Sequence, residues 1–260
     1  MKSMNYTTLI FDAFDTVIHI NTAKLPRLVI DGTEVSTTAP AAYEAYSAIF
    51  GKPDFDVFYR AFSQSFTRVS EIRRMDLKEI LSTERFKLML DMLGHPPAEI
   101  TDAHVESITK AHMRQLQDSF EVRPETLRVL DWARTRFRTG MISNFAYAPA
   151  FHESIDEFGI RKAFETIVVS AEVGWCKPHR IIFDHTFDKM RIRPDEALFI
   201  GDQLYVDIFG ALNSGMHAAW IETERQDWLP PEAQPPSCKP TYTLREISEL
   251  MSVLERKMGL

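Results

Sequence analysis

The chain has 260 residues, of which 45% are hydrophobic and 26% are charged. These proportions are typical of folded globular proteins and exclude wholesale disorder, and the length suits one main domain with a smaller one. The formal net charge of −7 gives no basic surface of the kind that binds nucleic acid. Composition therefore indicates an acidic globular protein that has no nucleic-acid partner.

The first half of the chain predicts one strand, a hairpin and a helical block. A short apolar run at residues 7–11 predicts a buried strand and is too short for a signal peptide or a membrane helix. An Asp-Gly pair within residues 28–35 predicts a β-hairpin. Helical patterns follow at residues 41–51, 55–69, 77–94 and 104–116. A helical block inserted after the first strand should form a separate cap.

From residue 122 the chain alternates between strand and helix. Apolar runs predict buried strands at residues 139–142, 166–169, 197–200 and 218–221, and amphipathic segments predict helices at 124–137, 150–158, 179–190 and 205–212. A Pro-rich loop at 229–240 precedes a last predicted helix at 243–258. This alternation predicts an α/β fold with a doubly wound, Rossmann-like parallel sheet. We assign residues 1–16 and 122–260 to that core, and 17–121 to a flap hairpin and helical cap.

Polar residues stand where the predicted strands end. Asp12 ends the first strand, Ser143-Asn144 the second, and Asp202 the fourth, with Asp207 shortly after it. Lys177 lies near the exit of the third strand. In an open α/β sheet, ligands bind outside the carboxyl ends of the strands. Carboxylates suit a hard cation such as Mg²⁺, and a lysine with a serine hydroxyl suits phosphoryl oxygens. The residues thus favour magnesium-assisted phosphoryl chemistry with Asp12 as the nucleophile.

The order of these motifs resembles the haloacid dehalogenase superfamily of hydrolases. The resemblance runs from residue 7 to about residue 222 and rests on FDAFDT, ISN, CKP with IIF downstream, and GDQLYVD followed by GALNSGM. The block at residues 17–121 matches the helical cap that one branch of the family inserts after the first strand. The family resemblance implies a hydrolase that acts on a small-molecule substrate, which we expect to be phosphorylated.

The resemblance also implies a role for each matching residue. Asp12 is similar to the nucleophile and first magnesium ligand, and Asp202 is similar to a further ligand. The backbone carbonyl of Phe14 would be another ligand, and Asp207 would support the metal shell. The resemblance implies that the substrate or its phosphate is bound by Phe14, Ser143, Asn144 and Lys177. Ser143 and Lys177 would also act in catalysis.

The first motif departs from the family's phosphatases at two positions. Phe14 stands where those enzymes usually carry the acid that protonates the leaving alcohol, and Asp15 replaces the usual glycine. Loss of a positioned general acid costs about two to four powers of ten in rate. Asp15 is either a residue that caps a turn or a substitute acid. Dehalogenases of the family have an aromatic residue at the position of Phe14, but their fourth motif holds no metal.

Four functional hypotheses therefore stay open. The leading hypothesis is a magnesium-dependent phosphatase that forms an aspartyl-phosphate on Asp12. The alternatives are hydrolysis of a 2-haloacid through an aspartyl ester, with phosphonate cleavage as a weaker option, and a degenerate, non-catalytic binding protein. The two cysteines, Cys176 and Cys238, lack metal-ligand spacing, so we expect packing roles and a reducing, cytoplasmic setting. We expect no membrane partner, and the sequence does not indicate an oligomeric state.

Overall fold

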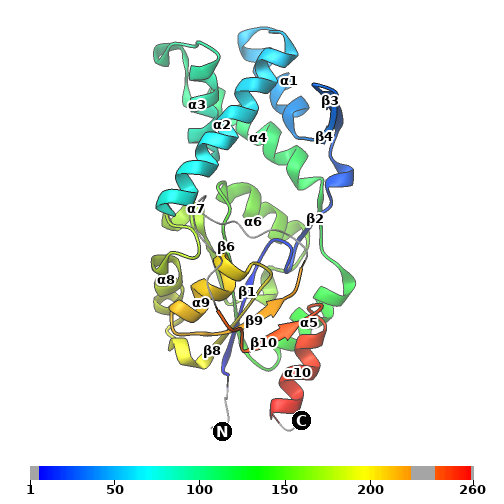
Figure 1. Cartoon of the computed structure of the whole chain (residues 1–260), viewed down its shortest axis with the longest axis vertical. Helices are drawn as coiled ribbons and strands as arrows, with labels where there is room; N and C mark the ends of the chain where they lie inside the picture. Colours follow the sequence, from blue (N-terminus) through cyan, green and yellow to red (C-terminus); the bar gives the residue numbers. More distant parts are fainter. Residues whose placement is uncertain (1–5, 224–237, 259–260) are drawn as a thin grey trace.

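A six-stranded parallel sheet forms the core of the computed structural model, which describes residues 6–223 and 238–258. Its strand order is β10-β9-β8-β1-β6-β7 (Figure 1). The strands are β1 Thr8–Asp12, β6 Arg138–Ser143, β7 Thr166–Val169, β8 Ala197–Gly201, β9 His217–Ile221 and β10 Tyr242–Leu244. From β1 the chain adds β6 and β7 on one side and then β8, β9 and β10 on the other. The predicted doubly wound parallel sheet is confirmed.

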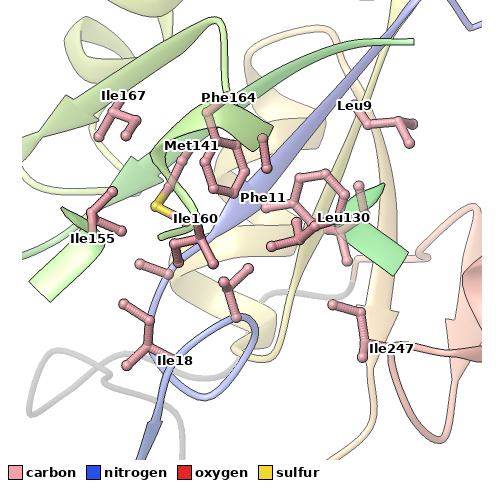
Figure 2. Packing of buried hydrophobic residues seen from close by; sticks show 14 of the residues in the cluster. Leu9, Phe11, Ile18, Leu130, Met141, Ile155, Ile160, Phe164, Ile167 and Ile247 are labelled. Carbon is pink, nitrogen blue, oxygen red and sulfur yellow. The ribbon is translucent and has the colours of Figure 1, made fainter. Parts of the chain in front are cut away.

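Helices cover both faces of this sheet, which explains why its strands are continuous apolar runs. Successive side chains of β1 point to opposite faces, so Leu9 and Phe11 join one hydrophobic cluster and Ile10 joins the other. Figure 2 shows part of the first cluster, where Phe11 lies near Leu130. The first face carries α5 Pro124–Arg134, α6 Ala148–Glu157 and α10 Glu249–Met258. The second carries α8 Arg180–Met190, the π-helix η5 Leu204–Phe209 and α9 Gly210–Asn213. The short helix α7 Ser170–Val173 follows β7.

A helical unit with its own hydrophobic cluster lies beyond the carboxyl ends of the core strands (Figure 1). It contains the hairpin β3 Arg27–Ile30 and β4 Thr33–Ser36, and the helices α1 Ala39–Phe50, α2 Phe55–Asp76, α3 Ser82–Met92 and α4 Asp102–Gln117. The hairpin turns at Asp31-Gly32, where both residues have positive φ, as the Asp-Gly signal predicted. Short strands β2 His19–Ile20 and β5 Phe120–Glu121 pair where this unit joins the core. We call the unit the cap.

Single-turn 3₁₀ helices complete the described secondary structure. They are η1 Thr22–Lys24, η2 Pro97–Glu99, η3 Arg161–Ala163 and η4 Pro194–Glu196. Within the part of the chain that the structure describes, no helix has both the length and the apolar character that a membrane span requires.

Three predicted helices differ from the structure. The segment predicted as one helix at 243–258 begins with strand β10, because Tyr242 and Thr243 pair in parallel with β9, and its helix starts only at Glu249. The helix predicted at 77–94 starts at Ser82, because Leu77 adopts positive φ and the next residues are extended along the core. The helix predicted at 205–212 is π-helical through Phe209. Most of the Pro-rich loop predicted at 229–240 lies outside the described residues.

Because His112 of the cap is buried, we expect the stability of the folded protein to depend on pH. Burial and then the neighbouring Arg85 hold the pKa of His112 well below its usual value. Its ring contacts Thr38 Oγ1 at 2.7 Å and Arg85 at 3.5 Å. A depressed pKa means that His112 is neutral in the folded state. The stability that depends on this neutral form is fully present above about pH 6.5 and is lost as the pH falls. We expect the free energy of unfolding to fall by about 1 kcal/mol for each pH unit below about pH 6.5.

Urea unfolding between pH 7.5 and 5.5 measures this dependence. His112→Gln should show a weaker loss of stability on acidification than the wild type. His185→Gln changes an exposed histidine and is the matched control, which should follow the wild type. An identical pH dependence of the wild type and His112→Gln would contradict the assignment.

Candidate active site

The strand order brings the predicted site residues to one edge of the sheet. β1 lies between β6 and β8, at the point where the direction of chain winding reverses. Asp12 pairs with Ile142, so Ser143 follows on the neighbouring strand, and Phe11 pairs with Ile200, so Gly201 and Asp202 follow on the other. Such a switch point is where open α/β sheets bind ligands.

Three carboxylates and one ammonium group meet at this edge. Oxygens of Asp12, Asp202 and Asp207 lie within 4.8 Å of one another, and all three residues are buried. The ammonium group of Lys177, whose residue is 1% exposed, donates to Asp12 Oδ1 and to Asp207 Oδ1, the latter at 2.7 Å. Neither carboxylate oxygen of Asp202 has a hydrogen-bond partner on another residue in the described ranges. The structure thus brings together four of the residues that the sequence singled out.

Burial and mutual charge control the protonation of this cluster. Burial alone lowers the pKa of Lys177, but attraction to the Asp12 and Asp207 carboxylates outweighs it and raises the pKa above its usual value. Burial raises the pKa of Asp12, and the attraction of Lys177 opposes that shift. Burial, and then repulsion from Asp207 and Asp12, raises the pKa of Asp202. Three carboxylates share one ammonium group, so the excess negative charge requires protons or a cation.

A glycine in the fourth motif lets Asp207 reach the cluster, a requirement that the sequence analysis missed. A Cβ on Gly201 would lie 2.6 Å from the Cβ and Oδ2 of Asp207, which is closer than real contacts allow. The backbone N–H of Gln203 donates to Asp207 Oδ2 at 3.1 Å and so holds this carboxylate on its second oxygen. Gly201 is therefore required for packing against Asp207, and its neighbour Asp202 supplies a carboxylate of the site.

Ser143 and Asn144 differ in how they are engaged. The hydroxyl of Ser143 is buried and has no hydrogen-bond partner among the described residues. The side-chain oxygen of Asn144 accepts from the Lys177 N–H at 2.7 Å, and its amide nitrogen donates to the Lys177 carbonyl at 3.0 Å. Asn144 therefore positions the backbone of Lys177, whereas the Ser143 hydroxyl makes no hydrogen bond to the described part of the chain.

The two unusual residues of the first motif point to different surroundings. The Phe14 ring packs against the rings of Phe120, Phe145 and Phe151, with centroids 5.0, 5.1 and 5.9 Å away. Asp15 has a φ of 62° and lines a separate cavity of about 300 Å³ together with His19. The carboxylate cluster does not contribute to the lining of that cavity. Phe14 is thus part of an aromatic cluster, and Asp15 lines a cavity to which the carboxylates do not contribute.

The fold and the site together define a hydrolase that has an α/β core, an acidic centre at the switch point of its sheet, and a helical cap. The family model for haloacid dehalogenase-like hydrolases matches residues 6–215. The chain belongs to this family, as the order of its motifs indicated.

Relatives with known or assigned activities include several phosphatases. A putative HAD-hydrolase, YfnB of Bacillus subtilis, is 23% identical over 96% of this chain and 95% of its own length. Pyrimidine 5'-nucleotidase YjjG of Escherichia coli is 25% identical over 65% of this chain and 69% of its own. A glyceraldehyde 3-phosphate phosphatase of Pyrococcus furiosus is 35% identical, but over only 37% of this chain and 39% of its own. These relatives support a hydrolase and do not specify its substrate.

Solved structures that share the fold include a HAD phosphatase from Thermococcus onnurineus, whose alignment covers 95% of this chain and 97% of its own length, with a TM-score of 0.61 and 20% identity. The alignment with magnesium-bound YfnB covers 96% of this chain and 99% of the length of YfnB, with a TM-score of 0.62 and 18% identity. A 2-haloacid dehalogenase from Pseudomonas syringae pv. Tomato DC3000 covers the same shares, with a TM-score of 0.64 and 19% identity. The fold alone therefore does not separate the two activities, and the separation has to come from the site.

Proposed function

We propose that the protein is a magnesium-dependent phosphatase of a small phosphorylated metabolite, in which residues 17–121 form the cap. The observation that carries this proposal is the buried cluster of three carboxylates around one lysine. A dehalogenase of the family needs no metal, so that function does not account for the two carboxylate oxygens of Asp202, which have no hydrogen-bond partner on another residue that the structure describes. The phosphatase relatives support the same choice.

The donor set of the cluster fits Mg²⁺. This ion prefers oxygen ligands and is held in proteins by one or two carboxylates together with substrate phosphates. Asp12 and Asp202 would hold it with the Phe14 carbonyl, and Asp207 would support them through Lys177. When bound, the cation would neutralise charge on the phosphoryl group and reduce the repulsion between the carboxylates.

The residues of the chain then divide the chemistry between them. The Asp12 carboxylate attacks phosphorus, so that an O–P bond forms to Asp12 as the bond to the leaving oxygen breaks. Lys177 and Ser143 donate to the phosphoryl oxygens and stabilise the charge there. Water then attacks phosphorus, which releases inorganic phosphate and restores the Asp12 carboxylate. Closure of the cap over this edge would exclude bulk water.

We expect Mg²⁺ to stabilise the wild-type protein through Asp202. Saturating MgCl₂ should raise Tm by about 5 °C relative to EDTA, because the ion binds the folded state and relieves repulsion among buried carboxylates. Asp202→Asn should raise Tm in EDTA and lose most of the response to Mg²⁺. Asp195→Asn, at an exposed position, is the control and should respond like the wild type. Differential scanning fluorimetry checks all three, and an undiminished response of Asp202→Asn would count against the metal site.

Hydrolysis should depend steeply on the leaving group, because Phe14 stands at the sequence position where the family's phosphatases usually carry the general acid. With Mg²⁺, kcat/KM for p-nitrophenyl phosphate or acetyl phosphate should exceed kcat/KM for glycerol phosphate by about 100-fold or more, because kcat/KM reports the step in which the leaving group departs. Turnover should vanish in EDTA. Equal kcat/KM values would show that another group donates the proton.

The same assay tests the alternative functions. Halide release from 2-chloropropionate that EDTA does not affect would identify a dehalogenase, which the aromatic Phe14 favours. Intact Mg²⁺ binding without turnover of any phosphorylated compound in a broad panel would support a non-catalytic binding protein.

A further inference from the structure

An extended segment of the cap lies directly against the core beside Lys177. We call residues 77–80, between α2 and α3, the strap. The Glu79 N–H donates to the Gly174 carbonyl at 3.0 Å, and the Cys176 N–H donates to the Leu77 carbonyl at 2.8 Å. Lys78 forms an antiparallel bridge with Trp175. The strap therefore pairs with the core residues that immediately precede Lys177 in the chain.

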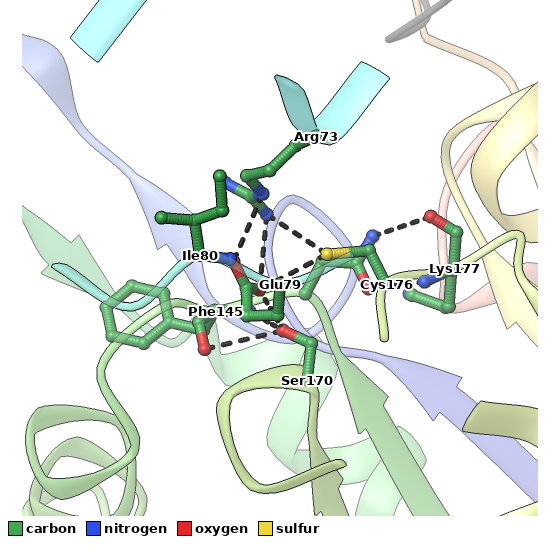
Figure 3. Close-up of polar contacts among 8 residues, drawn as sticks. Arg73, Glu79, Ile80, Phe145, Ser170, Cys176 and Lys177 are labelled. Carbon is green, nitrogen blue, oxygen red and sulfur yellow. Dashed lines mark hydrogen bonds and ion pairs between the residues drawn. The ribbon is translucent and has the colours of Figure 1, made fainter. Parts of the chain in front are cut away.

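The strap inserts one charged side chain, Glu79, into the core. This side chain is 0% exposed, and Arg73 Nε of α2 lies 3.1 Å from its Oε1 atom. Its Oε2 atom accepts from the hydroxyl of Ser170 and from the thiol of Cys176, the latter at 3.3 Å (Figure 3). A buried carboxylate with several charge-assisted hydrogen bonds has little freedom to move. The Glu79 side chain thus contacts the cap and the core at the same time.

Ser170 connects Glu79 to the second loop of the site. The hydroxyl of Ser170 accepts from the Phe145 N–H at 2.9 Å, and Phe145 follows Ser143 by two residues. Asn144, which lies between them, holds the Lys177 backbone through both of its amide atoms. Contacts of Glu79 therefore reach both loops that carry the predicted phosphate-binding groups, one through Cys176 and one through Ser170.

We propose that Glu79 is a positioning residue, through which the strap of the cap sets the places of Ser143 and Lys177. The proposal rests on the proposed function in so far as these two groups hold the phosphoryl oxygens. Groups behind the residues that contact substrate are worth about 10- to 100-fold in activity, because small displacements weaken transition-state contacts. A purely structural Arg73–Glu79 pair would affect stability and leave the kinetics of the folded enzyme unchanged.

Glu79→Gln tests this proposal. The amide keeps the shape of the side chain, but it removes the charge opposite Arg73 and one of the two acceptor oxygens. We expect kcat for p-nitrophenyl phosphate to fall about 10- to 100-fold with KM nearly unchanged. We also expect faster hydrogen exchange at the amides of Phe145, Cys176 and Lys177. Glu84→Gln on α3, an exposed glutamate paired with Lys87, is the matched control and should match the wild type in both measurements.

Ser170→Ala is a second variant that preserves packing. It deletes one buried hydroxyl and should reproduce the faster exchange at Phe145 and part of the fall in kcat. Wild-type exchange and wild-type kcat per folded molecule in both variants would overturn the proposal. Faster exchange in both variants of a protein whose wild type hydrolyses no phosphorylated compound would support the positioning role and reject the proposed phosphatase function.

Discussion

Asp12→Asn is expected to lower kcat for p-nitrophenyl phosphate by at least about four powers of ten. An amide oxygen is a poor nucleophile, and the change also removes a carboxylate from the partners of Lys177 and from the expected metal ligands. The variant should remain folded, because asparagine has almost the same shape and one buried negative charge is lost. Steady-state kinetics of protein with a wild-type unfolding curve measure the effect.

Asp15→Asn is the matched control for this experiment. It removes a carboxylate three residues away, and asparagine tolerates the φ of 62° at this position. Because Asp15 lines the separate cavity beside His19, most of the activity should remain. Substantial turnover by Asp12→Asn would exclude Asp12 as the nucleophile. A loss of about 100-fold in Asp15→Asn would instead identify Asp15 as the substitute acid.

Phe14→Asp, which introduces the carboxylate usual in the family's phosphatases, is expected to destabilise this protein. The change removes an aromatic ring from contact with Phe120, Phe145 and Phe151 and places a charge among the remaining rings. Loss of a packed aromatic side chain and partial burial of an unpaired carboxylate should together lower the free energy of unfolding by about 3 kcal/mol. We expect no rise in kcat for glycerol phosphate.

Phe14→Leu is the control, because it keeps an apolar side chain in the cluster and should cost only about 1 kcal/mol. Urea unfolding of the two variants and of the wild type compares them directly. If Phe14→Asp were as stable as the wild type and hydrolysed glycerol phosphate faster, the position would accept a general acid. The aromatic cluster would then not be the reason for the phenylalanine.

The sequence by itself determined the core fold and the family. Short apolar runs followed by polar residues are local features, and the strands of a parallel sheet have their carboxyl ends on the same edge. For that reason Asp12, Ser143 and Asp202 could be predicted to lie at one edge of the sheet before any geometry was known. The Asp-Gly turn of the hairpin was predictable for the same local reason.

Only the tertiary structure decided which neighbours these residues have. Strand β10 forms by pairing with β9, and the strap takes its extended form along the residues before Lys177, so local helical periodicity did not predict either segment. The aromatic partners of Phe14 and the contact of Glu79 with Ser170, 91 residues away, are likewise non-local. Packing partners depend on how distant segments come together, and sequence spacing along one segment does not contain that information. The sequence therefore singled out the polar residues at the strand ends, and the tertiary structure decided what holds them in place.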